Sequence, residues 1–72
     1  MTKEQTFLTD NLLAELLKII MEKRNANIQD ALDMLYNSQL YDKINDPETG
    51  LYFQSADYNY ELLENELSIN NN

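Results

Sequence analysis

Apolar side chains recur at intervals of three and four residues along the first third of the chain. One row consists of Leu8, Leu12, Leu16 and Ile20, and a second row beside it consists of Leu13, Leu17 and Met21. This spacing predicts an amphipathic helix over about residues 6–24, with an apolar arc wide enough for more than one neighbour. Two starts are compatible with the sequence: a capping box of Thr2 with Gln5, or a cap at Thr9 with Asp10 in the first turn.

A second, shorter apolar stripe follows Asn27, which is a favourable N-cap residue with Asp30 in the first turn behind it. The stripe consists of Ile28, Ala31, Leu32 and Leu35. The polar residues at 37–38 favour a break in the helix, and a further short helix begun by Ser38 is expected near residues 38–45.

Residues 46–50 have the sequence Asp-Pro-Glu-Thr-Gly and contain the only proline and the only glycine of the chain. This combination predicts a tight turn. Residues 51–53, Leu-Tyr-Phe, are too few to build a sheet, and we expect an extended segment whose rings lie across the helices. Ser55 or Asp57 then caps a last helix that ends near Leu67.

Together these elements predict an all-α fold, a small three-helix domain with a short extra helix and an ordered aromatic turn. The domain is expected to span residues 1–69, with a frayed tail at 70–72. Its expected core consists of Leu13, Leu16, Leu17, Ile20, Ile28, Leu32, Leu35, Leu40, Ile44, Leu51, Phe53, Leu63 and Leu67. With 72 residues and no cysteine, the chain must gain its stability from helix packing or from self-association.

Histidine and cysteine do not occur in the sequence. The chain therefore lacks the usual general base at neutral pH, the usual thiolate nucleophile and the strongest side-chain ligands for transition metals. Carboxylates are the reactive groups that remain, and most of them fall on the polar faces of the predicted helices. We therefore expect no enzymatic activity, no catalytic residue and no cofactor.

The segment around Gly50 has a superficial likeness to a calcium-binding loop. When Gly50 is aligned with the invariant glycine of such a loop, Asn45, Pro47 and Thr49 occupy the first ligand positions, and Ala56 stands where a bidentate acid is needed. Proline and alanine provide no side-chain ligand, so the sequence predicts no metal site.

The formal charge of the chain is -8, and most of it lies in the second half. Residues 37–72 contain seven acidic residues and a single base, Lys43, whereas residues 1–36 contain six acidic residues and four bases. Nucleic-acid binding depends on Lys and Arg residues that neutralise phosphates, and these are few in this chain. An anionic membrane repels an acidic protein surface. We therefore expect no direct contact with nucleic acid or membrane, and attraction to a basic partner protein. No apolar run approaches the roughly 18–20 residues that span a bilayer, and the cytoplasm is the default location.

Four of the five tyrosines lie in this acidic half, between carboxylates. Tyrosine combines a large apolar surface with a hydroxyl at low entropic cost, which makes it common at protein interfaces. Alternatively, the rings fill gaps between short helices. The candidate partner-binding residues are Tyr41, Tyr52, Tyr58, Tyr60, Glu61 and Glu64.

From residue 27 to residue 67 the chain also resembles a group of short bacterial proteins. The shared pattern is a capped amphipathic helix over 28–38, Leu-Tyr-Asp-Lys-Ile at 40–44, Asp-Pro-Glu-Thr-Gly-Leu-Tyr at 46–52, and Tyr-x-Tyr-Glu-Leu-Leu at 58–63. The proteins of this group are helical and uncharacterised, and some are encoded beside proteins that resemble ADP-ribosyltransferase toxins. The resemblance implies a compact helical accessory protein with no assigned catalysis.

These observations support three hypotheses about function. The first is a small acidic module that binds a partner protein, such as a basic toxin or enzyme, in a regulatory or accessory role. The second is a homodimeric structural protein, because the first helix has apolar residues around more of its circumference than one small neighbour would cover. The third is an acidic mimic of nucleic acid, which requires carboxylates in a linear array on one surface.

Overall fold

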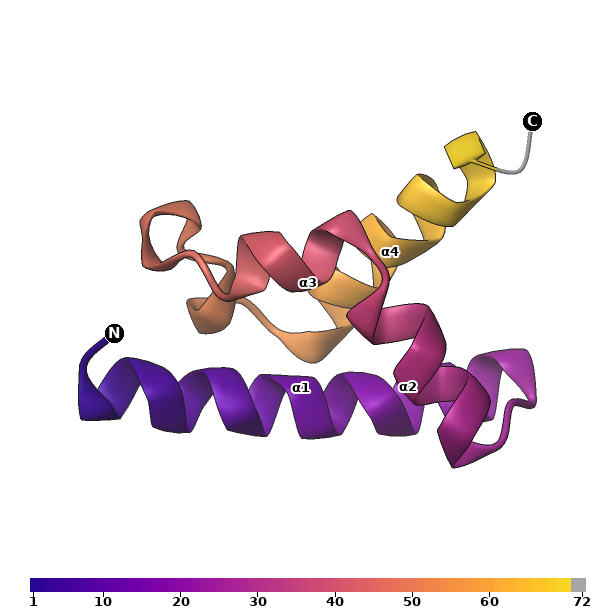
Figure 1. Ribbon diagram of the computed structural model, residues 1–72, viewed down its shortest axis with the longest axis horizontal. Coiled ribbons are helices and arrows are strands. Elements are labelled where there is room, and N and C mark those ends of the chain that lie inside the picture. The colour runs from indigo at the N-terminus through magenta and orange to yellow at the C-terminus, as the bar shows by residue number, and fades with distance from the viewer. Residues whose placement is uncertain (71–72) are drawn as a thin grey trace.

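The apolar periodicity of the chain produces four α-helices in the computed structural model, which describes residues 1–70 (Figure 1). The elements are α1 (Lys3–Arg24), α2 (Ile28–Tyr36), α3 (Gln39–Ile44), the 3-10 turns η1 (Pro47–Thr49) and η2 (Leu51–Phe53), and α4 (Ala56–Asn70). No strand occurs within residues 1–70, and the all-α fold class is confirmed. Of the tail expected at 70–72, residues 71 and 72 lie outside the described part of the chain.

A capping box sets the start of α1. The Thr2 hydroxyl oxygen accepts a hydrogen bond from the Gln5 N–H at 3.1 Å, and Gln5 Oε1 accepts one from the Thr2 N–H at 2.9 Å. These bonds satisfy two backbone donors that have no partner inside the helix. The structure thus has the earlier of the two starts that the sequence allows, and α1 begins at Lys3 rather than near residue 6.

Asparagine and serine residues end α1 and cap the starts of α2 and α3. Asn25 ends α1 in the left-handed conformation (φ 50°, ψ 42°), which asparagine adopts more often than most residues. Asn27 Oδ1 then accepts a hydrogen bond from the Asp30 N–H at 2.8 Å and begins α2. The Ser38 hydroxyl oxygen accepts one from the Tyr41 N–H at 3.1 Å and begins α3. The break predicted at Ser38 is therefore confirmed.

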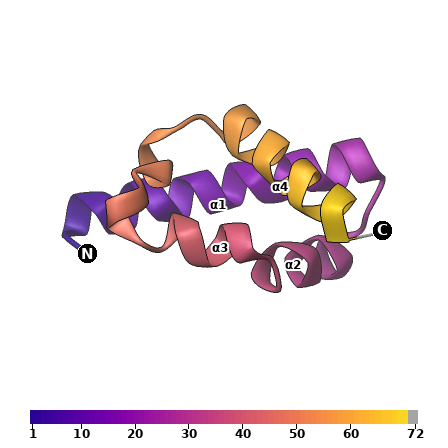
Figure 2. The ribbon, with the colours of Figure 1, turned by 90° about the horizontal axis from the view of Figure 1, so that it is seen from above.

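Helix α1 forms one long side of the molecule, and α2 and α4 pack against it. Figure 1 shows α3 and α4 on the same side of α1, with α2 crossing the C-terminal end of α1. Helix α3 packs against α4 (Figure 2). The molecule measures 35 × 23 × 18 Å.

One hydrophobic core joins all four helices. Its buried apolar residues are Leu12, Leu16, Ile20, Ala31, Leu35, Leu40, Ile44, Tyr60 and Leu63. Among the expected core residues, Leu13, Leu17, Leu51 and Leu67 are only partly buried against this cluster, and Leu32 is half-buried as well. Leu12, Ala31 and Tyr60 are core residues that the expected set did not include.

Ile28 was expected in the core but is 58% exposed. It is the first residue of α2 and follows the turn directly, so it lies at the end of the helix. The α2 residues that reach the core are Ala31 and Leu35, one and two turns further along.

Phe53 was also expected in the core but is 71% exposed. The segment 51–53 is not extended, as the sequence suggested, but forms the 3-10 turn η2. Successive side chains of a 3-10 helix point about 120° apart, so three consecutive residues cannot all face the helices. Leu51 and Tyr52 are partly buried, and Phe53 points to solvent.

Candidate interaction surface

The candidate partner-binding residues come from three parts of the fold. Tyr41 belongs to α3, where it is half-buried, and its ring centroid lies 4.8 Å from that of Tyr36 on α2. This aromatic pair fills the junction between two short helices. Tyr41 therefore fits the packing alternative better than a partner contact.

Tyr60 is only 4% exposed and belongs to the core, so it is unable to contact a partner in this fold. Its hydroxyl has no hydrogen-bond partner within residues 1–70. Burial raises the pKa of Tyr60 above its ordinary value of 10.0; Glu64 acts in the same direction and Arg24 acts against it. Of the two alternatives for the tyrosines, Tyr60 follows the packing one, because the i, i+3 spacing to Leu63 puts both side chains on the buried face of α4.

Tyr52 and Phe53 form an aromatic pair at the end of η2, with ring centroids 4.8 Å apart. The Tyr52 hydroxyl accepts a hydrogen bond from Gln5 Nε2 at 3.2 Å, which ties the turn to the start of α1. Phe53 lies on the solvent side of this anchored ring. This exposure was not predictable from the sequence, because three consecutive residues Leu-Tyr-Phe do not indicate which side chain a 3-10 turn exposes.

Polar side chains hold this turn in one conformation. The buried Asn59 on α4 donates through Nδ2 to the carbonyl oxygens of Ser55 at 3.0 Å and Leu51 at 3.2 Å. At the other end of the turn, the Thr49 hydroxyl donates to the Lys43 carbonyl oxygen at 2.7 Å. The exposed Phe53 is therefore attached to backbone that side-chain bonds fix on both sides.

We call residues 46–58 the acidic aromatic turn. Its exposed side chains include three acidic residues and two aromatic residues, namely Asp46, Glu48, Phe53, Asp57 and Tyr58. The segment contains no base. Of the sequence candidates, Tyr52 and Tyr58 belong to this turn.

Glu61 and Glu64 continue the acidic surface along α4. Together with Asp57 they have the spacing i, i+4 and i+7, which places three carboxylates on one face of the helix. All three residues are exposed. Within the described chain, the one ion pair joins Lys18 to Glu15 on α1 at 3.6 Å. None of the carboxylates of α4 or of the turn forms an ion pair within residues 1–70.

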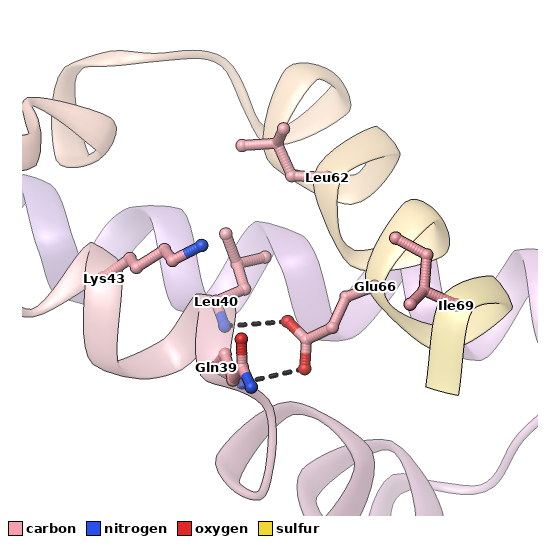
Figure 3. Close-up of a pocket in the computed structure, with 6 residues that line it drawn as sticks. All are labelled: Gln39, Leu40, Lys43, Leu62, Glu66 and Ile69. Carbon is pink, nitrogen blue, oxygen red and sulfur yellow. Dashed lines mark hydrogen bonds between the residues drawn. The ribbon is translucent and has the colours of Figure 1, made fainter. Parts of the chain in front are cut away.

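A groove of about 240 Å³ lies between α3 and α4 (Figure 3). The residues that line it are Gln39, Leu40, Lys43, Leu62, Glu66 and Ile69. The Glu66 carboxylate accepts hydrogen bonds from the backbone N–H groups of Gln39 at 2.8 Å and Leu40 at 2.9 Å, and so caps α3 from another helix. The polar group most suited to a ligand in this groove is therefore already bound, and we assign the groove a structural role.

No group of three or more carboxylates in the described residues is arranged to hold a metal ion. No helix within residues 1–70 combines the length and the apolar character needed to cross a membrane.

Comparison with protein-family models, curated proteins and solved structures gives no match for this chain. The charge and exposure of the surface residues are therefore the main guide to its function.

Proposed function

We propose that this protein is a non-catalytic docking module that binds a basic partner protein through the acidic aromatic turn and the adjoining carboxylates of α4. The observation that carries the proposal is the setting of Phe53. This ring is 71% exposed, is attached to a turn fixed by hydrogen bonds, and shares that turn with carboxylates that form no ion pair within residues 1–70. Exposure of a large apolar side chain to water is unfavourable in free energy. Because the turn is already fixed, little conformational entropy is lost when a partner buries this side chain.

The chemistry of the surface favours arginine-containing and lysine-containing partners. A guanidinium or ammonium group can stack on Phe53 or Tyr58 while it pairs with a nearby carboxylate. The fixed turn lowers the conformational entropy lost on binding, because the aromatic side chains are already positioned. The negative potential of the second half of the chain also speeds the approach of a positively charged protein.

The resemblance of residues 27–67 to bacterial proteins, some of them encoded beside toxin-like proteins, adds a candidate class of partner. A basic toxin or enzyme in the cytoplasm would fit the charge, and the module would act as its regulator or accessory subunit. Mimicry of nucleic acid fits less well, because the carboxylates lie on every helix and on the turn, whereas a mimic needs them in one linear array.

Affinity capture from extracts of the native host tests this proposal, with a matched pair of charge-reversal variants. Glu61→Lys combined with Glu64→Lys alters the acidic face of α4. Glu22→Lys combined with Asp33→Lys makes the same change in net charge on α1 and α2, and serves as the control.

At low salt, the unmodified protein is expected to retain a basic protein. The α4 variant should retain at least about tenfold less of it, and the control variant should retain nearly as much as the unmodified protein. A photo-crosslinking amino acid at position 53 should attach to the same protein. Failure to capture a basic protein at low salt, or equal loss in both variants, would contradict the proposal.

A further inference from the structure

The side chain of Gln5 joins two segments that lie far apart in the sequence. Its Oε1 accepts a hydrogen bond from the Thr2 N–H at 2.9 Å, inside the capping box of α1. Its Nε2 donates to the Tyr52 hydroxyl at 3.2 Å, 47 positions along the chain. Within residues 1–70, no other side-chain hydrogen bond links α1 to the acidic aromatic turn. A single half-buried amide therefore connects the start of α1 with this turn.

The capping box determines which end of the Gln5 amide faces the turn. The oxygen of a glutamine side chain accepts hydrogen bonds, and its nitrogen donates them. Because the Thr2 N–H occupies the oxygen, the nitrogen is the end that reaches the Tyr52 hydroxyl. Gln5 belongs to the first turn of α1, so fraying of this turn also removes the bond to Tyr52.

Tyr52 in turn restricts the ring of Phe53. The centroids of the two rings lie 4.8 Å apart, and the ring planes are inclined by 38°. Phe53 is 71% exposed, and Tyr52 is its one aromatic neighbour within the described chain. The hydrogen bonds of Thr49 and Asn59 hold the backbone of the turn, but they do not set the side-chain rotamer of Phe53. The orientation of the Phe53 ring therefore depends on that of the Tyr52 ring.

We propose that Gln5 is a positioning residue for the docking surface, because through Tyr52 it holds the Phe53 ring in the orientation that meets a basic partner. This inference rests on the docking function proposed above, and adds to it a dependence on the first turn of α1. Helix ends open more readily than a packed core. When the first turn of α1 opens, the two rings rotate more freely, and docking loses the entropic advantage of a fixed surface.

A purely local role for Gln5 leads to different expectations. As a member of the capping box alone, Gln5 would stabilise α1, and its replacement would leave Phe53 unchanged. Thr2 and Tyr52 share the Gln5 amide and have no hydrogen bond to each other. A change at Thr2 that alters the environment of Phe53 therefore distinguishes a positioning residue from a local cap.

Fluorine NMR of 4-fluorophenylalanine at position 53 reports on the ring, because the neighbouring Tyr52 ring shifts the resonance. Gln5→Met keeps the side-chain length and the helix propensity but removes both hydrogen bonds. It should move the resonance at least halfway toward its position in the urea-unfolded protein. Gln5→Glu should leave the resonance near its natural position, because one carboxylate oxygen accepts from the Thr2 N–H and the other from the Tyr52 hydroxyl.

Thr2→Ala removes the hydroxyl of the capping box and should move the resonance less far, in the same direction as Gln5→Met. Circular dichroism verifies that each variant is folded. An unchanged resonance in Gln5→Met, or equal shifts in Gln5→Met and Gln5→Glu, would overturn the proposal. An unchanged resonance in Thr2→Ala would overturn the dependence on the first turn of α1.

Tyr52→Phe tests the same bond from its other end, and also decides the question if Gln5→Met fails to fold. It removes the hydroxyl, keeps the ring, and should move the resonance in the same direction as Gln5→Met. The double variant should move the resonance no further than the larger of the two single shifts, because both changes remove one interaction. Additive shifts would mean that the two side chains act independently, and would overturn the proposal.

Calorimetric titration with a hexa-arginine peptide tests the consequence for docking. Gln5→Met should weaken binding by about two- to fivefold, because the ring must be ordered on binding. The matched control is Gln29→Met, at an exposed glutamine of α2, which should leave the affinity unchanged. Equal affinities of Gln5→Met and the natural protein would overturn the positioning role. If the natural protein does not bind the peptide, the docking function is contradicted, whereas the fluorine resonances still decide whether Gln5 holds the ring pair.

Discussion

The two phenylalanines of the chain are exposed to a similar extent, 66% for Phe7 and 71% for Phe53, but they lie on surfaces of different electrostatic character. Phe7 lies on α1, where acidic and basic residues balance. Phe53 lies on the acidic aromatic turn, where no base occurs. The apolar contribution of each ring is the same, so the charge around it decides which partner is favoured.

Under the proposed docking function, a basic protein is favoured beside Phe53 because of the carboxylates around that ring, whereas the balanced charges of α1 give no electrostatic preference. The helix that carries Phe7 and the helix that follows the acidic aromatic turn share one hydrophobic core. To this core α1 contributes Leu12, Leu16 and Ile20, and α4 contributes Tyr60 and Leu63.

The largest expected effect comes from Leu35→Ala, which removes a fully buried side chain from the shared core. Loss of a buried leucine and the cavity it leaves should lower the free energy of unfolding by about 2–5 kcal/mol. In a domain of this size, that corresponds to a fall of more than about 10 °C in Tm. Thermal and urea unfolding measure both quantities.

Leu32→Ala on the same helix is the control for Leu35→Ala. Leu32 is only half-buried, so its loss should cost about half as much or less. Equal destabilisation by the two variants would show that the burial of α2 differs from that described. Because Leu51 of the acidic aromatic turn packs against the core, Leu35→Ala should also weaken docking of a basic partner near its Tm.

Asn59→Ala should loosen the acidic aromatic turn. It removes two hydrogen bonds to the turn, each worth about 1 kcal/mol, and should lower the free energy of unfolding by about 2 kcal/mol. Hydrogen exchange should become faster at the amides of Phe53 and Gln54, which lie in the turn. Docking of a basic partner should weaken as a result.

The control for Asn59→Ala is Asn65→Ala, an exposed asparagine on the same helix. This change should alter stability by less than about 0.5 kcal/mol and should leave exchange in the turn unaffected. Unchanged exchange in the Asn59→Ala variant would show that its side chain does not hold the turn.

Much of the fold could be predicted from the sequence, because local signals determine it. The apolar rows of α1 and the caps at Asn27 and Ser38 depend on residues three or four positions apart, and such short-range rules are readable in a single chain. The turn at residues 46–50 was equally clear, since proline and glycine have strong conformational preferences. The core residues on these helices followed from the same periodicity.

The features that the sequence analysis did not predict depend on contacts distant in sequence. The hydrogen bond from Gln5 to Tyr52 joins residues 47 positions apart, and no local pattern indicates it. The same holds for the capping of α3 by Glu66, whose backbone partners lie 26 and 27 positions away. The spacing of Tyr60 to Leu63 is compatible with burial, but the carboxylates on either side of Tyr60 are equally compatible with a partner contact, so the sequence alone leaves the two alternatives open.

Salt should weaken the proposed docking of a basic partner. Raising the ionic strength from about 50 mM to about 500 mM screens charges that are more than a few ångströms apart. Binding of a basic partner to the acidic aromatic turn should therefore weaken by about tenfold or more. Affinity capture over a salt series measures this effect, and a retained amount that does not change with salt would contradict an electrostatic contribution to docking.

The smallest effect is expected for Tyr60→Phe, which removes a buried hydroxyl that has no hydrogen-bond partner within residues 1–70. Near pH 7 the free energy of unfolding should change by less than about 1 kcal/mol, because no good hydrogen bond is lost. The variant should differ more at high pH. Burial raises the pKa of Tyr60 above 10.0 in the folded protein, so in that range the unfolded chain loses this proton first. The stabilisation is complete below about pH 10 and declines as the pH rises from there through the raised pKa of the folded state. Urea unfolding at about pH 8 and about pH 11 should therefore show a smaller loss of stability for Tyr60→Phe than for the natural protein, and equal losses would mean that the hydroxyl titrates as it does in water.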